Sequence, residues 1–241
     1  MEIKKASLVL ADISGYTKFV REHRTSLLHA EQIITDLLEA VIDTAEYPLT
    51  LNKLEGDAAL LFTPVQGDDA AVARDVTQQV LRFFQAFRQK QRALIKAGEG
   101  GCPCEACVNI DRLQLKAFLH QGEVVVKRVR QFEELAGENV ILIHRLLKNS
   151  LSAREYLLMT DMFYKLSGGL DDLLSEAHVE NYEDLGEIET VVFYPPPDSV
   201  PLVVPDTKPM SRPGGIMEAM RLKVKHYFTN LTKGQREFRH L

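Results

Sequence analysis

The stretch LVLADISGYTKF, residues 8–19, places an apolar run of strand character directly before an aspartate and a glycine. A second segment, NKLEGD at residues 52–57, repeats this combination of apolar residues, glycine and aspartate. A carboxylate at a strand end, beside a glycine that lets the backbone approach a ligand, is suited to hold Mg²⁺ against phosphate. Two such segments could bring Asp12 and Asp57 to one pair of metal ions. The alternative is that each aspartate only caps the turn or helix that follows its strand.

Length and composition indicate one globular domain with a short appendage. The chain has 241 residues, of which 45% are hydrophobic and 26% charged. Its apolar runs are all shorter than the roughly 20 residues of a membrane-spanning helix, and a strand pattern starts too early for a signal peptide. The three cysteines lie within residues 102–107 and do not resemble a disulfide framework. We therefore expect a cytoplasmic protein.

Charge is unevenly distributed along the chain. From residue 205 onward, eight Lys and Arg stand against three Asp and Glu, although the whole chain carries a net charge of −5. The acidic body argues against nucleic acid as a partner. The basic tail could contact a partner protein or, less favoured, a membrane surface.

The hydrophobic pattern predicts alternating strands and helices. Its order is βαββαβ with further elements behind it, which is typical of an α+β fold with a ferredoxin-like core. The segment after residue 113 is read as strand, turn and strand, with the turn at residues 120–122. The expected strands are residues 5–13, 49–54, 58–63, 113–129, 156–160 and 187–194, and the expected helices are residues 28–45, 68–97 and 138–150.

A C-terminal helical tail is expected behind this core. Residues 1–197 form the predicted main domain, and residues 198–214 form a proline-rich linker. Residues 215–241 contain a basic amphipathic helix. We expect this tail helix to pack on the body or on a partner.

Four motifs resemble those of the class III adenylate and guanylate cyclases, over about residues 6–194. DISGYT at residues 12–17 is similar to the family's strand-end motif, and KLEGD at residues 53–57 to its hairpin motif. HQGEV at residues 120–124 and an altered GENVILIHR at residues 137–145 follow in the family's order. Four motifs in order are more specific than any single one. The cysteine insertion further resembles an uncharacterised bacterial branch of this family.

The resemblance implies a cyclase-homology domain that converts a nucleoside triphosphate to its 3′,5′-cyclic monophosphate with two Mg²⁺ or Mn²⁺ ions. It assigns both metals to Asp12 and Asp57, helped by the backbone carbonyl of Ile13. Backbone amides at the following helix start would contact the β- and γ-phosphates. These amides belong to Gly15, Tyr16 and Thr17.

Three further roles follow from the resemblance. Lys53 and Glu134 fall on the positions that read the purine, and this pair is complementary to adenine, so ATP is the expected substrate. The pair Glu133-Glu134 could instead be a solvated edge. Arg145 falls on the arginine that stabilises transition-state charge, although it could be a surface residue of its helix. The family draws its aspartates and this arginine from different subunits, which implies a homodimer with composite sites.

The chain departs from the family at two positions. Ile141 stands where an asparagine orients the ribose, and Leu185 stands where a lysine contacts the terminal phosphates. Each loss could lower the rate by ~10²–10³. One alternative is therefore a degenerate domain that binds nucleotide and metal and acts as a regulatory or interaction module without turnover. Another is phosphoryl transfer on a different nucleotide.

The cysteines Cys102, Cys104 and Cys107 lie in a predicted loop. Three neighbouring thiols in a cytoplasmic protein favour a structural Zn²⁺ over disulfides. The fourth ligand could come from His120, from another histidine or from a symmetry-related loop. The alternative is a set of free or redox-sensitive thiols. His120, close to Gly122, could equally be a turn residue or a core histidine.

Overall fold

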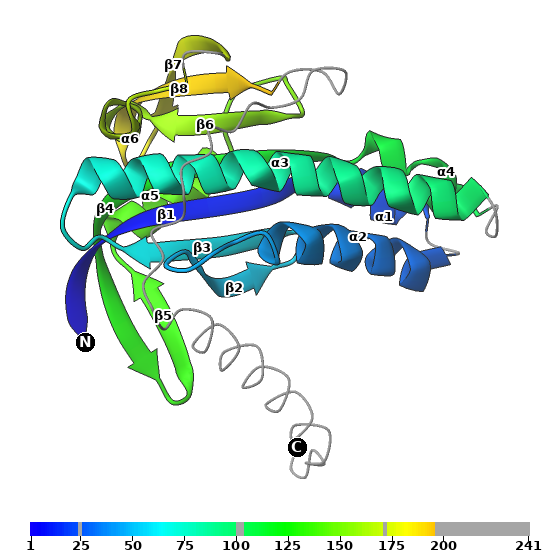
Figure 1. Ribbon diagram of the computed structural model, residues 1–241, viewed down its shortest axis with the longest axis horizontal. Coiled ribbons are helices and arrows are strands. Elements are labelled where there is room, and N and C mark those ends of the chain that lie inside the picture. Colours follow the sequence, from blue (N-terminus) through cyan, green and yellow to red (C-terminus); the bar gives the residue numbers. More distant parts are fainter. Residues whose placement is uncertain (24–25, 100–103, 171–172, 196–241) are drawn as a thin grey trace. The chain divides into compact units, whose positions relative to one another are not determined.

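The computed structural model describes residues 1–23, 26–99, 104–170 and 173–195 (Figure 1). The expected linker and tail helix lie outside the described residues, and so does Cys102. Among the helices of the described part, none combines the length and the apolar character that a membrane span requires.

A mixed sheet with helices on both faces forms this part of the chain. Its helices are α1 (Tyr16–Glu22), α2 (Leu27–Ile42), α3 (Asp69–Glu99), α4 (Glu105–Val108), α5 (Glu138–Leu146) and α6 (Asp161–Ser167). Its strands are β1 (Glu2–Ser14), β2 (Thr50–Glu55), β3 (Ala58–Pro64), β4 (Gln114–Val129), β5 (Phe132–Ala136), β6 (Tyr156–Thr160), β7 (Leu174–Tyr182) and β8 (Gly186–Tyr194).

The strand order confirms the ferredoxin-like core. The described sheet runs β2-β3-β1-β4-β6-β8-β7, and β5 pairs with β4. The first four strands are antiparallel neighbours, as a split βαβ arrangement requires. β6 joins β4 in parallel and extends the sheet toward β8 and β7.

The central strand β1 separates two hydrophobic cores. Val9, Ala11 and Ile13 are buried in one core with residues of α2 and α3, whereas Leu8 and Leu10 are buried in the other with residues of α5. This alternation follows from the two-residue period of a strand. Figure 1 shows α2 and α3 side by side on one face of the sheet.

The predicted turn at residues 120–122 is wrong, because β4 is one continuous strand of 16 residues. Its pairing with β1 extends from Gln114 to Val126 and keeps the segment extended. The chain reverses later, where Arg130 has a positive φ of 56°, and then forms β5. His120 is consequently a buried core histidine, which was one of its expected roles.

The sequence pattern missed several elements at the C-terminal side. α6 and β7 were not predicted, and α4 lies in the expected cysteine loop. The predicted helices 28–45, 68–97 and 138–150 appear as α2, α3 and α5, with ends shifted by at most four residues. β7 was missed because most of its side chains are exposed, so it lacks an apolar pattern.

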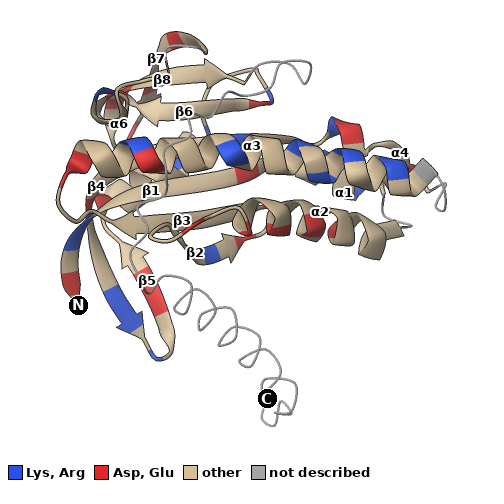
Figure 2. Cartoon of the chain, in the orientation of Figure 1, with Lys and Arg blue, Asp and Glu red and all other residues tan. Residues whose placement is uncertain are grey.

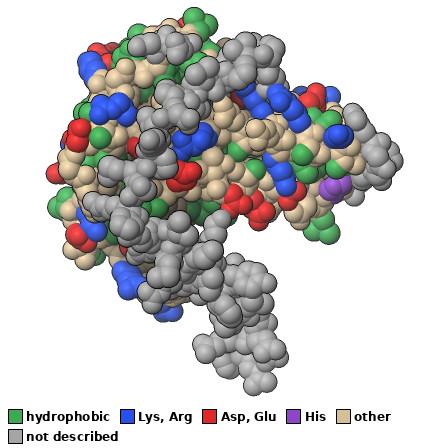
Figure 3. All heavy atoms as spheres, viewed as in Figure 1, with side chains coloured by type: hydrophobic (Ala, Val, Ile, Leu, Met, Phe, Trp, Pro, Cys, Tyr) green, Lys and Arg blue, Asp and Glu red, His purple; other side chains and the backbone are tan. Residues whose placement is uncertain are grey.

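Charged residues join the helices to each other and to the sheet. Figure 2 marks basic residues along α3 and acidic residues along the neighbouring α2, and Figure 3 shows blue and red side chains on the same face of the molecule. Asp36 of α2 and Lys90 of α3 form an ion pair at 3.3 Å. Arg88 of α3 makes two hydrogen bonds, at 3.0 and 2.7 Å, to Glu155, which immediately precedes β6. Because both partners are largely buried, this second pair constrains where α3 lies on the sheet.

Substitution of Glu155 tests this constraint. We expect Glu155→Gln to lower the free energy of unfolding by about 2 kcal/mol, because it removes the negative charge that accepts both of these hydrogen bonds from the largely buried Arg88 guanidinium. Urea unfolding followed by circular dichroism measures the effect. The control Glu2→Gln removes the exposed Lys4–Glu2 pair and should change stability by less than about 0.5 kcal/mol. Equal losses in the two variants would contradict the assigned constraint.

Candidate functional site

A row of polar side chains crosses three strands on the face that also carries α5. Asp12 of β1 lies opposite Lys116 of β4, and Lys116 lies opposite Tyr156 of β6. Residues opposite each other on paired strands project from the same face of a sheet. The Lys116 ammonium lies 5.5 Å from the centre of the Tyr156 ring. A cation is therefore held beside Asp12, on the same face as Leu8 and Leu10.

Asp57 reaches this row from the turn between β2 and β3. Gly56 adopts a φ of 67° in that turn, and the backbone amide of Ile13 donates to the carbonyl oxygen of Asp57 at 3.1 Å. Asp12 lies opposite Ala58, the residue after Asp57. The structure thus brings together the two aspartates that the sequence analysis singled out.

The two carboxylates are electrostatically strained. Burial raises the pKa of Asp12 to about 6, the charge of Asp57 adds to this, and Lys116 opposes it. Burial also raises the pKa of Asp57, and the charge of Glu31 from α2 adds to the shift. One lysine therefore does not compensate the acidic groups at this point. Carboxylate pairs of this kind suit hard divalent cations, which take oxygen ligands.

The predicted phosphate loop follows Asp12 directly. Gly15 has a φ of 96°, which only glycine adopts readily, and α1 begins at Tyr16. The Tyr16 hydroxyl donates to a carboxylate oxygen of Glu31 at 3.0 Å. The amides of Gly15, Tyr16 and Thr17 therefore lie within five residues of Asp12, at the start of a helix.

Arg154 is a residue of this site that sequence reasoning missed. A Cβ atom at Gly15 would lie 2.5 Å from Nη2 of Arg154, so the guanidinium is packed against the glycine backbone. The same nitrogen donates to the backbone carbonyl of Arg112. Arg154 lies in an irregular segment before β6 and carries no motif, so no sequence signal pointed to it. Lys116 did carry a signal, as a charge within a buried strand.

The two residues expected to read the base lie on β2 and β5, two strands that are not paired with each other in the described sheet. Lys53 of β2 forms an ion pair with Glu55 at 2.7 Å, and Glu55 also hydrogen-bonds with His144 of α5 at 2.9 Å. Burial alone would raise the pKa of Glu55, but Lys53 and His144 outweigh it and lower that pKa. Glu134 lies on β5. The side chain of Asn52 in β2 donates a hydrogen bond to the backbone carbonyl of Glu133 in β5 at 3.2 Å, and so connects the two strands.

Arg145 lies on α5 and has an intramolecular partner. Its guanidinium donates to one carboxylate oxygen of Asp184, at 3.1 Å from Nε and 2.5 Å from Nη2. These hydrogen bonds lower the pKa of Asp184. Asp184 immediately precedes Leu185, the position at which the expected lysine is lost. Ile141, one turn earlier on α5, has 51% of its surface exposed.

His120 does not lie beside the cysteines. Its ring nitrogens hydrogen-bond with Thr160 at 3.1 Å and with Asn139 at 2.8 Å, and burial lowers its pKa. The Asn139 side chain occupies the space that a Cβ at Gly122 would fill, which explains the glycine. His29 of α2 is instead the histidine next to the cysteines that the structure describes.

A family model for a protein of unknown function, DUF2652, matches residues 34–156, more than half of the chain. The chain belongs to the DUF2652 family. A relative of this DUF2652 protein, the uncharacterized protein Rv2561/Rv2562 of Mycobacterium tuberculosis, is 35% identical over 173 residues. That match covers 72% of this chain and 78% of the relative. The family match contains Asp57 and the cysteine segment, whereas Asp12 precedes it.

Two solved cyclase structures are similar to this DUF2652 protein. The adenylyl cyclase CyaB from P. aeruginosa has a TM-score of 0.58 and 14% identity, over 83% of this chain and 98% of that chain. A dimeric guanylyl cyclase domain of the RhoGC fusion protein from the aquatic fungus Blastocladiella emersonii has a TM-score of 0.54 and 16% identity, over 80% and 98% of the two chains. The expected resemblance to class III cyclases is therefore confirmed for the fold, which by itself does not establish an activity.

Because the pKa of Asp12 is raised, we predict that the ionised Asp12 carboxylate lowers the free energy of unfolding of the metal-free protein, by an amount that depends on pH. A folded-state pKa of about 6, above the ordinary 3.8, means that stability is lost as the pH rises through this interval. In the presence of a chelator, Asp12→Asn should raise the free energy of unfolding at pH 7.5 by on the order of 2 kcal/mol. The gain should be much smaller at pH 4, where the carboxyl is protonated in the folded chain and partly protonated in the unfolded chain, and it should vanish below about pH 3. Thermal unfolding across this range measures it.

The exposed Asp111 provides the matched control. Asp111→Asn should leave stability unchanged at both pH values, because this carboxyl is solvated in the folded protein. A gain of Asp12→Asn that persists undiminished at pH 4 would show that lost packing strain, rather than charge, explains the effect.

Proposed function

We propose that this chain binds a nucleoside triphosphate with divalent cations and converts it to the 3′,5′-cyclic monophosphate. The observation that carries the proposal is the proximity of Asp12, near the end of β1, to Asp57, in the turn before β3, where both carboxyl pKa values are raised. A buried acidic pair with an insufficient counter-charge is stabilised when cations bind. The cyclase-like fold supports the direction of this proposal.

Asp12 and Asp57 would hold Mg²⁺ or Mn²⁺, with the Ile13 carbonyl as a further ligand. Such ions supply charge neutralisation for a triphosphate and lower the pKa of an attacking hydroxyl. Lys116 lies opposite Asp12 and would keep the carboxylates charged and oriented in the absence of metal.

The triphosphate would lie against the start of α1. Because α1 begins directly after the left-handed Gly15, the amides of Tyr16 and Thr17 have no carbonyl acceptor within the helix. These amides would donate hydrogen bonds to phosphate oxygens. Arg154, packed against Gly15, would supply the positive charge that is lost at Leu185. Arginine is well suited to this role because its planar donors match phosphate oxygens.

ATP is the proposed substrate. Lys53 keeps donors to spare while it bonds Glu55, because an ammonium group has three of them. It would donate to N1 of adenine, and Glu134 would accept from the exocyclic amine. Arg145 would act on the α-phosphate of a site completed by a second copy, after release from Asp184. We therefore propose a head-to-tail homodimer, located in the cytoplasm.

A second candidate function is nucleotide binding without turnover. Ile141 supports it, because this exposed apolar side chain stands where the family uses a hydrogen-bonding residue. In that case the domain would signal through its conformation or its partners. Mutation at the metal site distinguishes the two functions.

The test incubates the full chain with Mn²⁺ and each of ATP, GTP, CTP and UTP, and identifies products by mass spectrometry. We expect cyclic AMP from ATP, its loss in Asp57→Ala, and a higher rate in Ile141→Asn, which restores a hydrogen-bonding side chain. Retained metal-dependent binding of ATP without any product would favour the second function. Absence of both binding and product would overturn both.

Arg154 gives a separate prediction. Arg154→Gln should weaken binding of ATP by about tenfold or more and binding of AMP much less, because only the triphosphate reaches the start of α1. Titration calorimetry with Mn²⁺ present measures both affinities. Arg74→Gln, which changes an exposed arginine near the start of α3, is the control and should alter neither. Equal weakening for AMP and ATP would exclude a contact with the terminal phosphates.

A further inference from the structure

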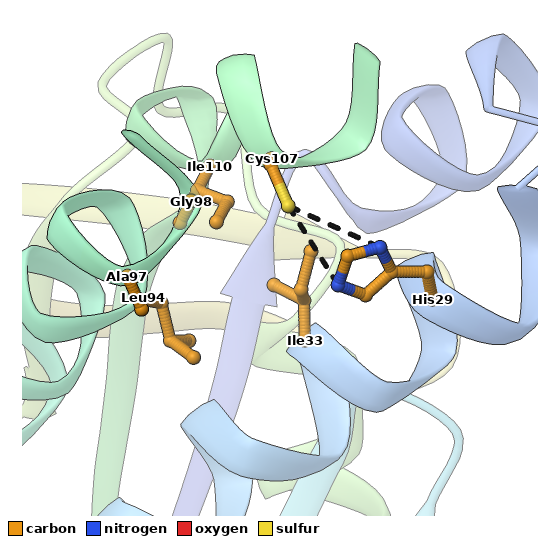
Figure 4. A pocket seen from close by; sticks show the side chains of 7 residues that line it. All are labelled: His29, Ile33, Leu94, Ala97, Gly98, Cys107 and Ile110. Atoms are coloured by element: carbon orange, nitrogen blue, oxygen red, sulfur yellow. Dashed lines mark hydrogen bonds between the residues drawn. The ribbon is translucent and has the colours of Figure 1, made fainter. Parts of the chain in front are cut away.

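One imidazole and two thiols converge away from the candidate catalytic carboxylates, at the facing ends of α2 and α4. The Sγ atoms of Cys104 and Cys107 lie 3.3 and 3.9 Å from Nδ1 of His29. All three ligand atoms lie within 4.8 Å of one another. Figure 4 shows the His29 ring directed toward the sulfur of Cys107, which lies 3.6 Å from its other nitrogen.

These separations match the edges of a zinc coordination tetrahedron. Zinc–sulfur bonds of about 2.3 Å and zinc–nitrogen bonds of about 2.05 Å, at tetrahedral angles, place sulfur and nitrogen about 3.6 Å apart. The two distances to Nδ1 of His29 lie on either side of this value. A thiol–imidazole hydrogen bond would explain one close contact, but it gives no reason for two thiols to gather at the same imidazole ring.

The surroundings also favour a buried structural ion. Cys107 has 9% of its surface exposed, and the adjoining cavity is lined mainly by apolar side chains, among them Ile33, Leu94 and Ile110 (Figure 4). Gly98, near the end of α3, makes this approach sterically feasible, because a Cβ there would lie 3.2 Å from that of Cys107. Thiolate ligands are soft and select zinc over magnesium or calcium.

We propose that His29, Cys104 and Cys107 bind one Zn²⁺ ion that joins α2 to α4. The ion would connect segments far apart in the chain, since His29 and Cys104 are separated by 75 residues. The sequence-based expectation that Cys102 is a ligand lies outside the described residues, and the proposal rests on the other three. It is independent of the proposed cyclase function.

The ion would also stabilise the region around α1. His23, which follows α1, hydrogen-bonds with Asn109, which follows α4, at 3.1 Å. Gln91 of α3 donates to the backbone carbonyls of Ile110 and Leu113, at 2.9 and 2.7 Å. Fixing α4 to α2 would hold these bonds in place, and with them the end of α1 opposite to the phosphate loop.

Metal analysis of the full chain tests the proposal. Protein purified in reductant, without a metal-affinity tag, should contain about one zinc per chain by mass spectrometry, and Cys107→Ser should lose most of it. His178→Ala is the control, because this histidine bonds Glu180 and Ser150 instead, and it should retain zinc. Reduced wild-type protein that contains no zinc and takes up none on titration would overturn the proposal.

Cobalt replacement keeps the test valid if Cys107→Ser does not fold. Wild-type protein loaded with Co²⁺ should show thiolate charge-transfer bands and the intense visible bands of tetrahedral coordination. His29→Cys should retain the metal and shift these bands, because a thiolate then replaces the imidazole beside the thiolates of Cys104 and Cys107. A wild-type spectrum of octahedral Co²⁺ without charge-transfer bands would contradict the assigned ligands. Removal of zinc by a chelator should lower the melting temperature by several degrees, and added zinc should restore it.

Discussion

The pairing of β1 with β3 on one side and β4 on the other is the constraint on which the rest of the structure depends. The backbone of β1 is hydrogen-bonded along both of its edges, and residues 6–11 of this strand are buried on both faces of the sheet. A shift of one residue would exchange the two faces, turn Asp12 toward α2 and α3, and place Leu8 and Leu10 in the wrong core. Hydrophobic packing along β1 therefore also sets the position of the carboxylate at its end.

The pairing of β1 brings negative charges together at the end of this strand, and nearby positive charge does not fully balance them. Asp12 and Asp57 lie close together, Glu31 adds a third negative charge, and the positive charge of Lys116 opposes them only in part. The two hydrophobic cores stabilise the fold enough to tolerate this cost. An arrangement that opposes local stability in this way is typical of a binding site, because a ligand of opposite charge relieves the strain.

The two proposed metal sites have opposite chemistry and are connected through the same short helix, α1. The carboxylates and Gly15 precede α1, whereas His23 follows it and bonds the segment after α4. Oxygen ligands at the first site suit exchangeable divalent cations that accompany a nucleotide. Sulfur and imidazole ligands at the second suit a permanent zinc ion. The same chain can therefore hold both ions without competition between them.

The sequence by itself determined the βαββαβ order and the candidate carboxylates, because strand and helix periods and glycine turns are local signals. It placed a false turn at residues 120–122, where a histidine and a glycine resemble a turn but the pairing with β1 keeps the strand straight. Only the tertiary structure decided that Lys116 lies opposite Asp12, that Arg154 packs against Gly15, and that His29 lies beside Cys104 and Cys107. These neighbours are far apart in the chain, and their proximity follows from strand register and helix packing, which no local pattern encodes.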